Sequence, residues 1–362
     1  MDTKNKSGQI SAHRYKYLLP NYGVFDEVRV FEPGPLPGPI DFKGCRLGVM
    51  ICEDMWADEV SECLMESGAD LLLAINGSPY ELGKTDERLN NAVARVTETN
   101  LPLIYVNQIG GQDELVFDGA SFVLGADRSL RVQAASFLDD IVYTRWQSTK
   151  DGRWKCDSQP PIKALDELSS IYSAMVLGLK DYVEKNNFPG VVLGISGGID
   201  SAFSAAVATD ALGPSRVKGI LMPSKYTSIE SNTDASELGN NLGIELMNIS
   251  INEIVNSYDN TLNDLFSGTE KDITEENIQS RTRGAILMAY SNKFGHMVIT
   301  NGNKSEVSVG YSTLYGDMCG GFSVVKDIYK TDLFKLSEWR NKNKPSLSLL
   351  DKNEIIPNNI IT

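Results

Sequence analysis

The sequence predicts an α/β protein with two domains, of which the second is a doubly wound parallel sheet. The chain has 362 residues, enough for two separate hydrophobic cores. Short apolar runs alternate with helical periodicity in both halves, and a polar, proline-bearing segment separates the halves. We therefore expect a first domain at 1–146, a linker at 147–165, a second domain at 166–341 and a C-terminal region at 342–362.

In the first domain, three apolar runs predict strands at 47–52, 70–76 and 101–107. A helical pattern at 86–100 lies between the last two. The segment 116–133 predicts a hairpin, which gives this α/β layer an antiparallel margin.

The second domain alternates strands and helices with short connections. The predicted strands are 190–195, 217–222, 244–249 and 297–300. The predicted helices are 165–185, 202–212, 231–241, 253–266 and 274–294. This alternation indicates parallel strands in a doubly wound sheet. Ligands of such sheets bind beyond the carboxyl ends of the strands, so we expect a site at 194–201 and 301–306.

Composition limits the classes of function. The net charge of −14 repels a phosphate backbone, which argues against nucleic-acid binding. No apolar run approaches the roughly 20 residues that span a bilayer, and the first residues lack the apolar core of a signal peptide. The five cysteines are scattered and odd in number, so neither a disulfide framework nor a zinc site is expected. A cytoplasmic protein without membrane or nucleic-acid partners fits these observations.

A glycine turn between a predicted strand and a predicted helix is the most informative motif. Its residues are Gly194, Ile195, Ser196, Gly197, Gly198, Ile199, Asp200 and Ser201. Adjacent glycines let backbone N–H groups reach an anion, and the N-terminus of the following helix adds positive charge. A carboxylate at Asp200 repels phosphate unless a divalent cation lies between them. The Lys-Ser/Thr pair of a Walker loop is absent, so the turn predicts a different kind of site for a nucleotide–metal complex.

This turn resembles the SGGxDS loop of the ATP pyrophosphatases, which cleave ATP between its α and β phosphates. GMP synthetase, asparagine synthetase and tRNA-thiolating enzymes share the loop. The resemblance therefore implies a chemistry, with ATP as a substrate, and leaves the acceptor open.

A cysteine directly after an apolar run is the second candidate centre. Cys52 follows 49–51 and precedes Glu53. A cysteine in a strand is commonly a small hydrophobic residue, but a thiol at a strand end is typical of an exposed acyl-transfer nucleophile. The chain has only two histidines, His13 and His296, so we expect a lysine or a carboxylate as the partner of this thiol.

This segment and the upstream loop KYLLPNYGVFDE at 16–27 resemble the nitrilase (carbon–nitrogen hydrolase) family. The catalytic triad of that family is Glu–Lys–Cys, and Lys16 and Cys52 match its lysine and cysteine. Four further residues match positions of its glutamine pocket: Tyr22, Glu53, Trp56 and Ser78. An ammonium beside a thiol lowers the pKa of the thiol and stabilises an oxyanion. The triad glutamate of the family lies further upstream than residue 1, so the resemblance implies a partial and inactive amidase domain.

A nitrilase-like domain followed by an SGGxDS domain resembles glutamine-dependent NAD synthetase, from Lys16 to about Asn341. The specific motifs of the second domain lie at 222–224, 276–284, 302–306, 310–317 and 326–330. The implied site residues are Asp200 and Glu306 for Mg²⁺, Asn301, Lys330 and the glycine turn for ATP, and Asn277, Arg281 and Glu306 for deamido-NAD. The family has Thr where Asn301 stands. An ordinary surface arginine remains the alternative for Arg281.

The resemblance implies that the nicotinate carboxylate of deamido-NAD attacks the α phosphate of ATP, and that ammonia then displaces AMP. In the family the ammonia comes from glutamine, and free ammonia is expected here. Both ends are shorter than in the family, so a fragment of a longer product is expected, and relatives imply a homo-oligomer. The alternatives are a silent fragment that binds only nucleotide or homologous subunits, another SGGxDS ligase, and a plain amidase.

Overall fold

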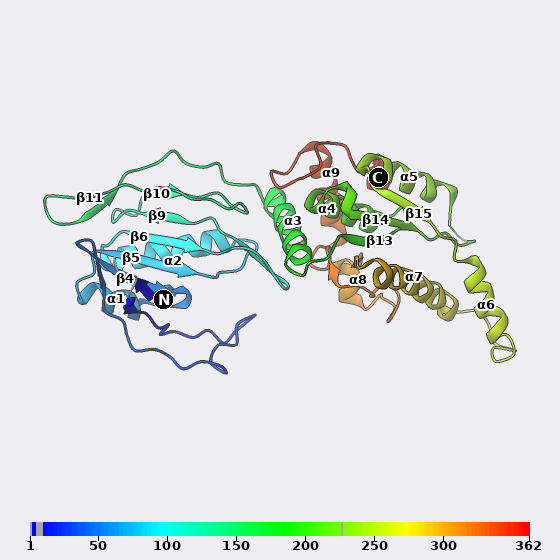
Figure 1. Ribbon diagram of the computed structural model, residues 1–362, viewed down its shortest axis with the longest axis horizontal. Helices are drawn as coiled ribbons and strands as arrows, with labels where there is room; N and C mark the ends of the chain where they lie inside the picture. Colours follow the sequence, from blue (N-terminus) through cyan, green and yellow to red (C-terminus); the bar gives the residue numbers. More distant parts are fainter. Residues whose placement is uncertain (1, 5–9, 226) are drawn as a thin grey trace. The chain divides into compact units, whose positions relative to one another are not determined.

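The computed structural model describes residues 2–4, 10–225 and 227–362, which form two compact units. The first unit contains 1–110 and 115–165, and the second contains 111–114 and 166–362. Both units are α/β, as the sequence predicts, and Figure 1 labels many of their helices and strands. None of the helices in the described ranges is long and apolar enough to cross a bilayer.

A six-stranded sheet forms the first unit, in the order β10-β9-β6-β5-β4-β3. Its strands are β3 (Ile40–Phe42), β4 (Cys45–Ile51), β5 (Leu71–Asn76), β6 (Leu103–Asn107), β9 (Phe122–Leu124) and β10 (Leu130–Gln133). Strands β4, β5 and β6 are parallel, and the outer strands are antiparallel. Helices α1 (Asp58–Glu66) and α2 (Lys84–Thr99) bury Leu64 and Val96 against this sheet. The sequence analysis did not predict α1.

The described residues also form separate two-stranded ribbons. They are β1 (Asp2–Lys4) with β2 (Ile10–His13), β7 (Ile109–Gln112) with β8 (Leu115–Asp118), and β11 (Trp146–Ser148) with β12 (Trp154–Cys156). The hairpin expected over 116–133 is present as β9 and β10, but its first residues belong to β8, which pairs with β7. The segment 147–165, for which the sequence suggests a linker, contains most of the β11–β12 hairpin.

A five-stranded sheet forms the second unit, in the order β15-β14-β13-β16-β17, and every pairing in it is parallel. Its strands are β13 (Val191–Ile195), β14 (Val217–Leu221), β15 (Glu245–Asn248), β16 (Met297–Thr300) and β17 (Phe322–Ser323). The chain runs outward from β13 to β15 and then continues on the other side of β13, at β16. The predicted doubly wound sheet is thus confirmed, with a topological switch point between β13 and β16, where ligands of this architecture bind.

Helices cover this second sheet. They are α3 (Glu167–Lys185), α4 (Ile199–Leu212), α5 (Ile229–Leu242), α6 (Asn252–Leu262), α7 (Ile273–Phe294), α8 (Lys304–Val309), α9 (Lys330–Lys342) and α10 (Asn358–Ile361). The short 3-10 helices are η1 (Cys52–Met55) in the first unit and η2 (Pro214–Arg216) in the second.

Helix α4 lies in the core of the second unit and contacts α3, α5 and α9 (Figure 1). All of its residues except Asp200 are buried, and small side chains such as Ala202 let neighbouring elements pack closely. Near its C-terminus, Asp210 accepts hydrogen bonds from Tyr172 Oη (2.7 Å) and from Arg340 Nε (2.6 Å). A fully satisfied buried network of this kind is rigid. It therefore fixes the C-terminal part of α4 against α3 and α9.

Candidate functional site

The glycine turn joins β13 to α4 at the switch point of the second sheet. The Ser196 amide donates to Ser201 Oγ (3.2 Å), and the Gly198 amide donates to Ser196 Oγ (3.2 Å). Gly197 has a φ of +81°, and a Cβ there would lie 2.5 Å from the carbonyl oxygen of Ser231. Glycine is therefore required at this position. The closed turn leaves the N-terminus of α4 facing the end of the sheet, where it can bind an anion.

Asn301, directly after β16, connects the two strands of the switch point. Its Nδ2 donates to the carbonyl oxygen of Gly194 in β13 (3.0 Å). Ile195 and Ile199, which flank the turn, are buried beneath it. Within the described part of the chain, Asn301 Oδ1 is buried and has no hydrogen-bond partner. An unpaired buried acceptor costs free energy, so a donor group of a bound nucleotide would stabilise this side chain.

Asp200 lies in the first turn of α4 and is held from across the switch point. Asn303 Nδ2 donates to Asp200 Oδ1 (2.8 Å), and Lys330 Nζ forms an ion pair with Asp200 Oδ2. Glu306 lies on α8 and accepts a hydrogen bond from the Asn303 amide (3.1 Å). Burial raises the pKa of Glu306; the Asn303 hydrogen bond opposes this rise, and the negative charge of Asp200 adds to it. The two carboxylates are therefore close enough to interact.

This pair of carboxylates fits a magnesium ion that is shared with a nucleotide. The described residues contain no group of three or more His, Cys, Asp or Glu side chains that could hold a metal alone. Mg²⁺ in nucleotide sites is usually bound by one or two carboxylates, with phosphate and water oxygens completing its octahedron. Burial is the main cause of the raised pKa of Glu306, and the smaller contribution from the Asp200 charge would be relieved by a cation between the two carboxylates.

The two residues predicted on α7 both contact the loop at 310–317. Asn277 Oδ1 accepts a hydrogen bond from Thr313 Oγ1 (3.0 Å). Arg281 Nε donates to the carbonyl oxygen of Leu314 (3.1 Å), while the residue as a whole remains exposed. One helical face therefore holds both residues at the edge of this loop, as their spacing of four predicts.

In the first unit, Cys52 begins η1 directly after β4 and has a φ of 53°. The strand expected at 47–52 thus ends one residue early, at Ile51, and the thiol lies on a sharp turn. Burial raises the pKa of the Cys52 thiol, and the Gly77 amide and the Lys16 ammonium oppose this rise without cancelling it. The lowered thiol pKa that the sequence predicts is therefore wrong, because desolvation outweighs the ammonium.

Lys16 has a carboxylate partner that the sequence analysis did not identify. Lys16 Nζ lies 2.7 Å from both carboxylate oxygens of Glu27. The loop that carries them is anchored by Asp54, which accepts a hydrogen bond from the Leu18 amide (2.8 Å). The negative charge of Glu27 also raises the pKa of Cys52, so the carboxylate is near the thiol. Glu27 is the last residue of the loop 16–27 that begins with Lys16, and this position was the sequence signal for the contact.

Two of the predicted glutamine-pocket residues, Tyr22 and Glu53, lie near the Cys52 thiol. Tyr22 Oη donates to Glu53 Oε1 (2.9 Å), and burial followed by this carboxylate raises the pKa of Tyr22. Lys84 Nζ lies over the ring of Trp56, 4.5 Å from its centre. The sequence analysis did not select Lys84, because a lone lysine at a helix start forms no pattern. The structure adds it as a cation beside the predicted pocket.

Ser78 lies inside a buried polar network. It is 3% exposed, its Oγ accepts a hydrogen bond from Arg88 Nε (3.0 Å), and its amide donates to Asn107 Oδ1 (2.9 Å). Arg88 in turn pairs with Asp118 (2.7 Å). These contacts fix the turn after β5, and the contact of Ser78 with glutamine stays a prediction.

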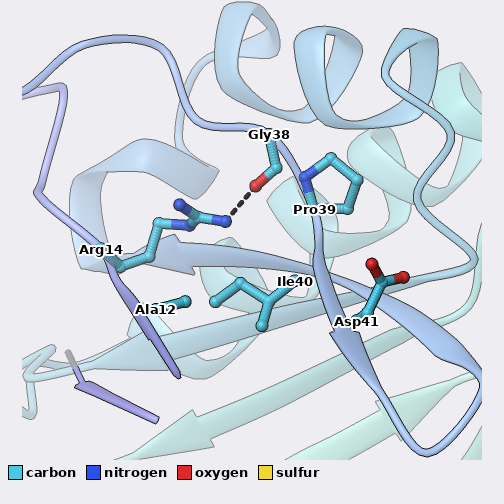
Figure 2. A pocket seen from close by; sticks show the side chains of 6 residues that line it. All are labelled: Ala12, Arg14, Gly38, Pro39, Ile40 and Asp41. Carbon is cyan, nitrogen blue, oxygen red and sulfur yellow. Dashed lines mark hydrogen bonds between the residues drawn. The ribbon is translucent and has the colours of Figure 1, made fainter. Parts of the chain in front are cut away.

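A cavity of about 420 Å³ lies elsewhere in the first unit. Figure 2 shows its lining residues: Ala12, Arg14, Gly38, Pro39, Ile40 and Asp41. Arg14 donates a hydrogen bond to the carbonyl oxygen of Gly38, and burial lowers the pKa of this arginine. None of the predicted site residues lines this cavity, so we assign it no part in the chemistry.

Alkylation of Cys52 by iodoacetamide should accelerate across the alkaline range. The thiolate is the reactive form, so the rate should rise about tenfold per pH unit up to the pKa of the thiol. Burial places this pKa above the ordinary value of 9.0. Peptide mass spectrometry measures the rate at Cys52 separately from the other cysteines. Lys16→Met should displace the profile to still higher pH, and a rate that levels off below pH 8 would contradict the assignment.

Two family models match the chain, carbon–nitrogen hydrolase over residues 4–155 and NAD synthase over residues 171–362. The second match covers more than half of the chain. The chain belongs to the NAD synthase family. For this NAD synthase family member, the glycine turn and the carboxylates joined by Asn303 lie at the ligand-binding end of the sheet.

Relatives within the NAD synthase family contain both parts of the chain. It is 46% identical over 356 residues to the glutamine-dependent NAD(+) synthetase of Rhodobacter capsulatus, covering 98% of this chain and 64% of that protein. The glutamine-dependent NAD(+) synthetase of Thermotoga maritima is 40% identical over 386 residues, with coverages of 98% and 66%. The structure of glutamine-dependent NAD+ synthetase from Acinetobacter baumannii, in complex with ADP, matches with a TM-score of 0.91 at 43% identity, over 99% of this chain and 66% of that chain. The chain thus spans slightly less than two thirds of the length of these relatives.

Proposed function

We propose that this chain is an NAD synthetase, which uses ATP to activate the nicotinate carboxylate of deamido-NAD and replaces AMP with ammonia. The observation that supports this most strongly is the glycine turn at the switch point, with Asp200 and Glu306 linked through Asn303. The relatives that share both domains are glutamine-dependent NAD(+) synthetases, and one of them has been solved with ADP bound.

The second unit would perform two displacements. A carboxylate oxygen of deamido-NAD attacks the α phosphorus of ATP, and pyrophosphate leaves with the electron pair of the broken P–O bond. Ammonia then attacks the acyl carbon, loses a proton, and AMP leaves. The α4 N-terminus and Lys330 stabilise negative charge on the phosphates. Mg²⁺, held by Asp200 and Glu306, would neutralise phosphate charge during the first displacement.

Deamido-NAD would lie along α7 and the loop at 310–317. Arg281 is exposed, and its guanidinium presents a planar fork that suits a phosphate. Asn277, which accepts from Thr313, retains its amide N–H groups for the substrate. Both residues would orient the nicotinate end toward the glycine turn.

We propose the Cys52 centre as the place where glutamine would bind and release ammonia. Cys52 Sγ would form a thioester with the amide carbon as the C–N bond breaks, the thiol proton would leave with ammonia, and water would then hydrolyse the thioester to glutamate. Lys16 would stabilise the oxyanion formed in each step. Glu27, at 2.7 Å from Lys16, would position that ammonium. Lys84, which pairs with Glu87 in the structure (2.9 Å), would attract the carboxylate of glutamine once that pair opens. The sequence-based expectation of free ammonia as the donor remains open to the test below.

NAD formation from deamido-NAD, ATP and Mg²⁺ tests the proposal, with ammonium chloride as nitrogen donor in one arm and glutamine in the other. We expect NAD in the ammonium arm, and a loss of about 100-fold or more in Asp200→Asn, because a ligand of the cation that would neutralise phosphate charge is removed. Synthesis with glutamine that depends on Cys52 would establish the glutaminase. Nucleotide binding without formation of NAD would support the alternative of a silent fragment. Amination of xanthosine monophosphate would identify the chain as another SGGxDS ligase.

A further inference from the structure

One buried residue, Asn303, connects the carboxylates of Asp200 and Glu306, the first through its side chain and the second through its backbone N–H. Asn303 is 1% exposed and is the N-cap residue of α8. Its side-chain Oδ1 accepts from the backbone N–H of Glu306 (3.1 Å), and its own backbone N–H donates to Glu306 Oε2 (3.1 Å). Its Nδ2 donates to Asp200 Oδ1 (2.8 Å), on the other side of the switch point.

An N-cap alone does not require asparagine. Serine and aspartate cap helices about as well, because a cap needs only an acceptor oxygen. The second contact does require an amide, since the side chain must donate to the Asp200 carboxylate while it accepts from Glu306. Aspartate has no donor when ionised, and the serine hydroxyl is one heavy atom shorter than the amide. The contact pair therefore identifies a task beyond helix capping.

We propose that Asn303 is a positioning residue for the magnesium pair: it fixes Asp200 and Glu306 relative to one another and determines which oxygens face the cation. This inference rests on the proposed function, in which these carboxylates hold Mg²⁺ with the nucleotide. Asp200 Oδ1 and Glu306 Oε2 are engaged by Asn303. Glu306 Oε1 is left for the cation, and Asp200 Oδ2 becomes available to it when the ion pair with Lys330 opens.

The orientation matters because Mg²⁺ demands nearly ideal octahedral geometry. Hydrogen bonds to ligating carboxylates hold them in that geometry, and loss of such a partner typically costs about 10- to 100-fold in metal affinity. Without Asn303, the Asp200 side chain would rotate toward Lys330, its remaining partner.

Metal titration of the full chain tests this inference, with Mn²⁺ as the probe and α,β-methylene-ATP as a nucleotide that is not cleaved between its α and β phosphates. Mn²⁺ prefers the same oxygen ligands and gives a signal in electron paramagnetic resonance. Asn303→Ser retains a helix cap and loses the Asp200 contact, whereas Asn303→Gly removes both. We expect about tenfold weaker Mn²⁺ binding in both variants. The affinity for the nucleotide without metal should stay within about twofold of the unmodified chain, because Asn303 does not contact the turn amides.

Two controls separate the outcomes. Asp166→Ser is the same kind of cap replacement at the start of α3, where Asp166 accepts from the Ser169 amide (2.9 Å), and it should leave Mn²⁺ affinity unchanged. If Asp200→Asn weakens Mn²⁺ binding while Asn303→Ser does not, Asn303 is only a cap and the inference is overturned. If Asp200→Asn has no effect on Mn²⁺ binding either, Asp200 and Glu306 do not hold the cation, and this part of the proposed function is contradicted. If Asn303→Gly lowers the melting temperature, Asn303→Ser, which keeps the helix cap, still tests whether Asn303 positions Asp200.

Discussion

Replacing Gly197 with alanine should lower kcat/KM for ATP by about 100-fold or more while the second unit still folds. The new Cβ would lie 2.5 Å from the Ser231 carbonyl oxygen and 2.9 Å from its Cα, so the turn must move away from the start of α5. The residue must also keep a φ of +81°, which costs a side chain with a Cβ about 1–2 kcal/mol. A shift of about 1 Å at a site that positions reacting groups can reduce a rate about 100-fold. We therefore expect at least that loss in kcat/KM for ATP.

Gly243→Ala provides the matched control for this experiment. Gly243 has a φ of +67° at the C-terminus of α5, but its Cβ would only touch Pro214 at an ordinary 3.8 Å. It therefore has the backbone cost without the collision. Titration of both variants with ATP, together with thermal unfolding, separates the two effects. Equal loss of ATP affinity in both would show that the turn tolerates a Cβ and that backbone strain alone explains the result.

The arrangement of the second sheet could be predicted because strand order follows from simple rules. Apolar runs such as 191–195 and 297–300 are buried on both faces, as parallel strands require. The helices between these parallel strands form crossover connections, which are almost always right-handed. The loops that follow these strands must then meet at one edge. The expected neighbourhood of Asp200 and Glu306 came from this topology.

The contacts within the site could not be predicted in the same way. Asp200 and Lys330 are 130 positions apart, and no periodicity relates them. Lys16 and Glu27 lie 11 apart in an irregular loop, so their contact depends on tertiary structure. Helix α8, by contrast, had a sequence signal: Asn303 and Glu306 have the spacing of a capping box. The thiol pKa was predicted wrongly because the sequence shows which charges are near and does not show how deeply Cys52 is buried.

Lys330→Gln should change metal binding and nucleotide binding in opposite directions. In the structure the Lys330 ammonium pairs with Asp200 Oδ2, the oxygen that the proposed cation would use. The ion pair is partly exposed, with 40% of the lysine side chain accessible, so it is worth at most about 1 kcal/mol. Its removal should tighten Mn²⁺ binding to the nucleotide-free chain by up to about fivefold.

The same substitution removes a positive charge from the proposed phosphate site. A cation that stabilises developing phosphate charge typically contributes about 100-fold or more to the rate. We therefore expect kcat/KM for ATP to fall by about that factor, even as the metal binds more tightly. Equilibrium titration with Mn²⁺ and steady-state NAD synthesis measure the two effects on the same preparation.

Lys335→Gln is the control, because Lys335 lies on the same helix and pairs with Asp332 at 2.8 Å, away from the glycine turn. It changes net charge equally and should alter neither quantity. If Lys330→Gln weakens Mn²⁺ binding as well, the ammonium does not compete with the cation for Asp200 Oδ2. The pair would then act only to orient Asp200, and the loss of ATP turnover would follow from a misplaced carboxylate. If Lys330→Gln tightens Mn²⁺ binding and lowers kcat/KM for ATP, Lys330 must leave Asp200 when the nucleotide–metal complex binds.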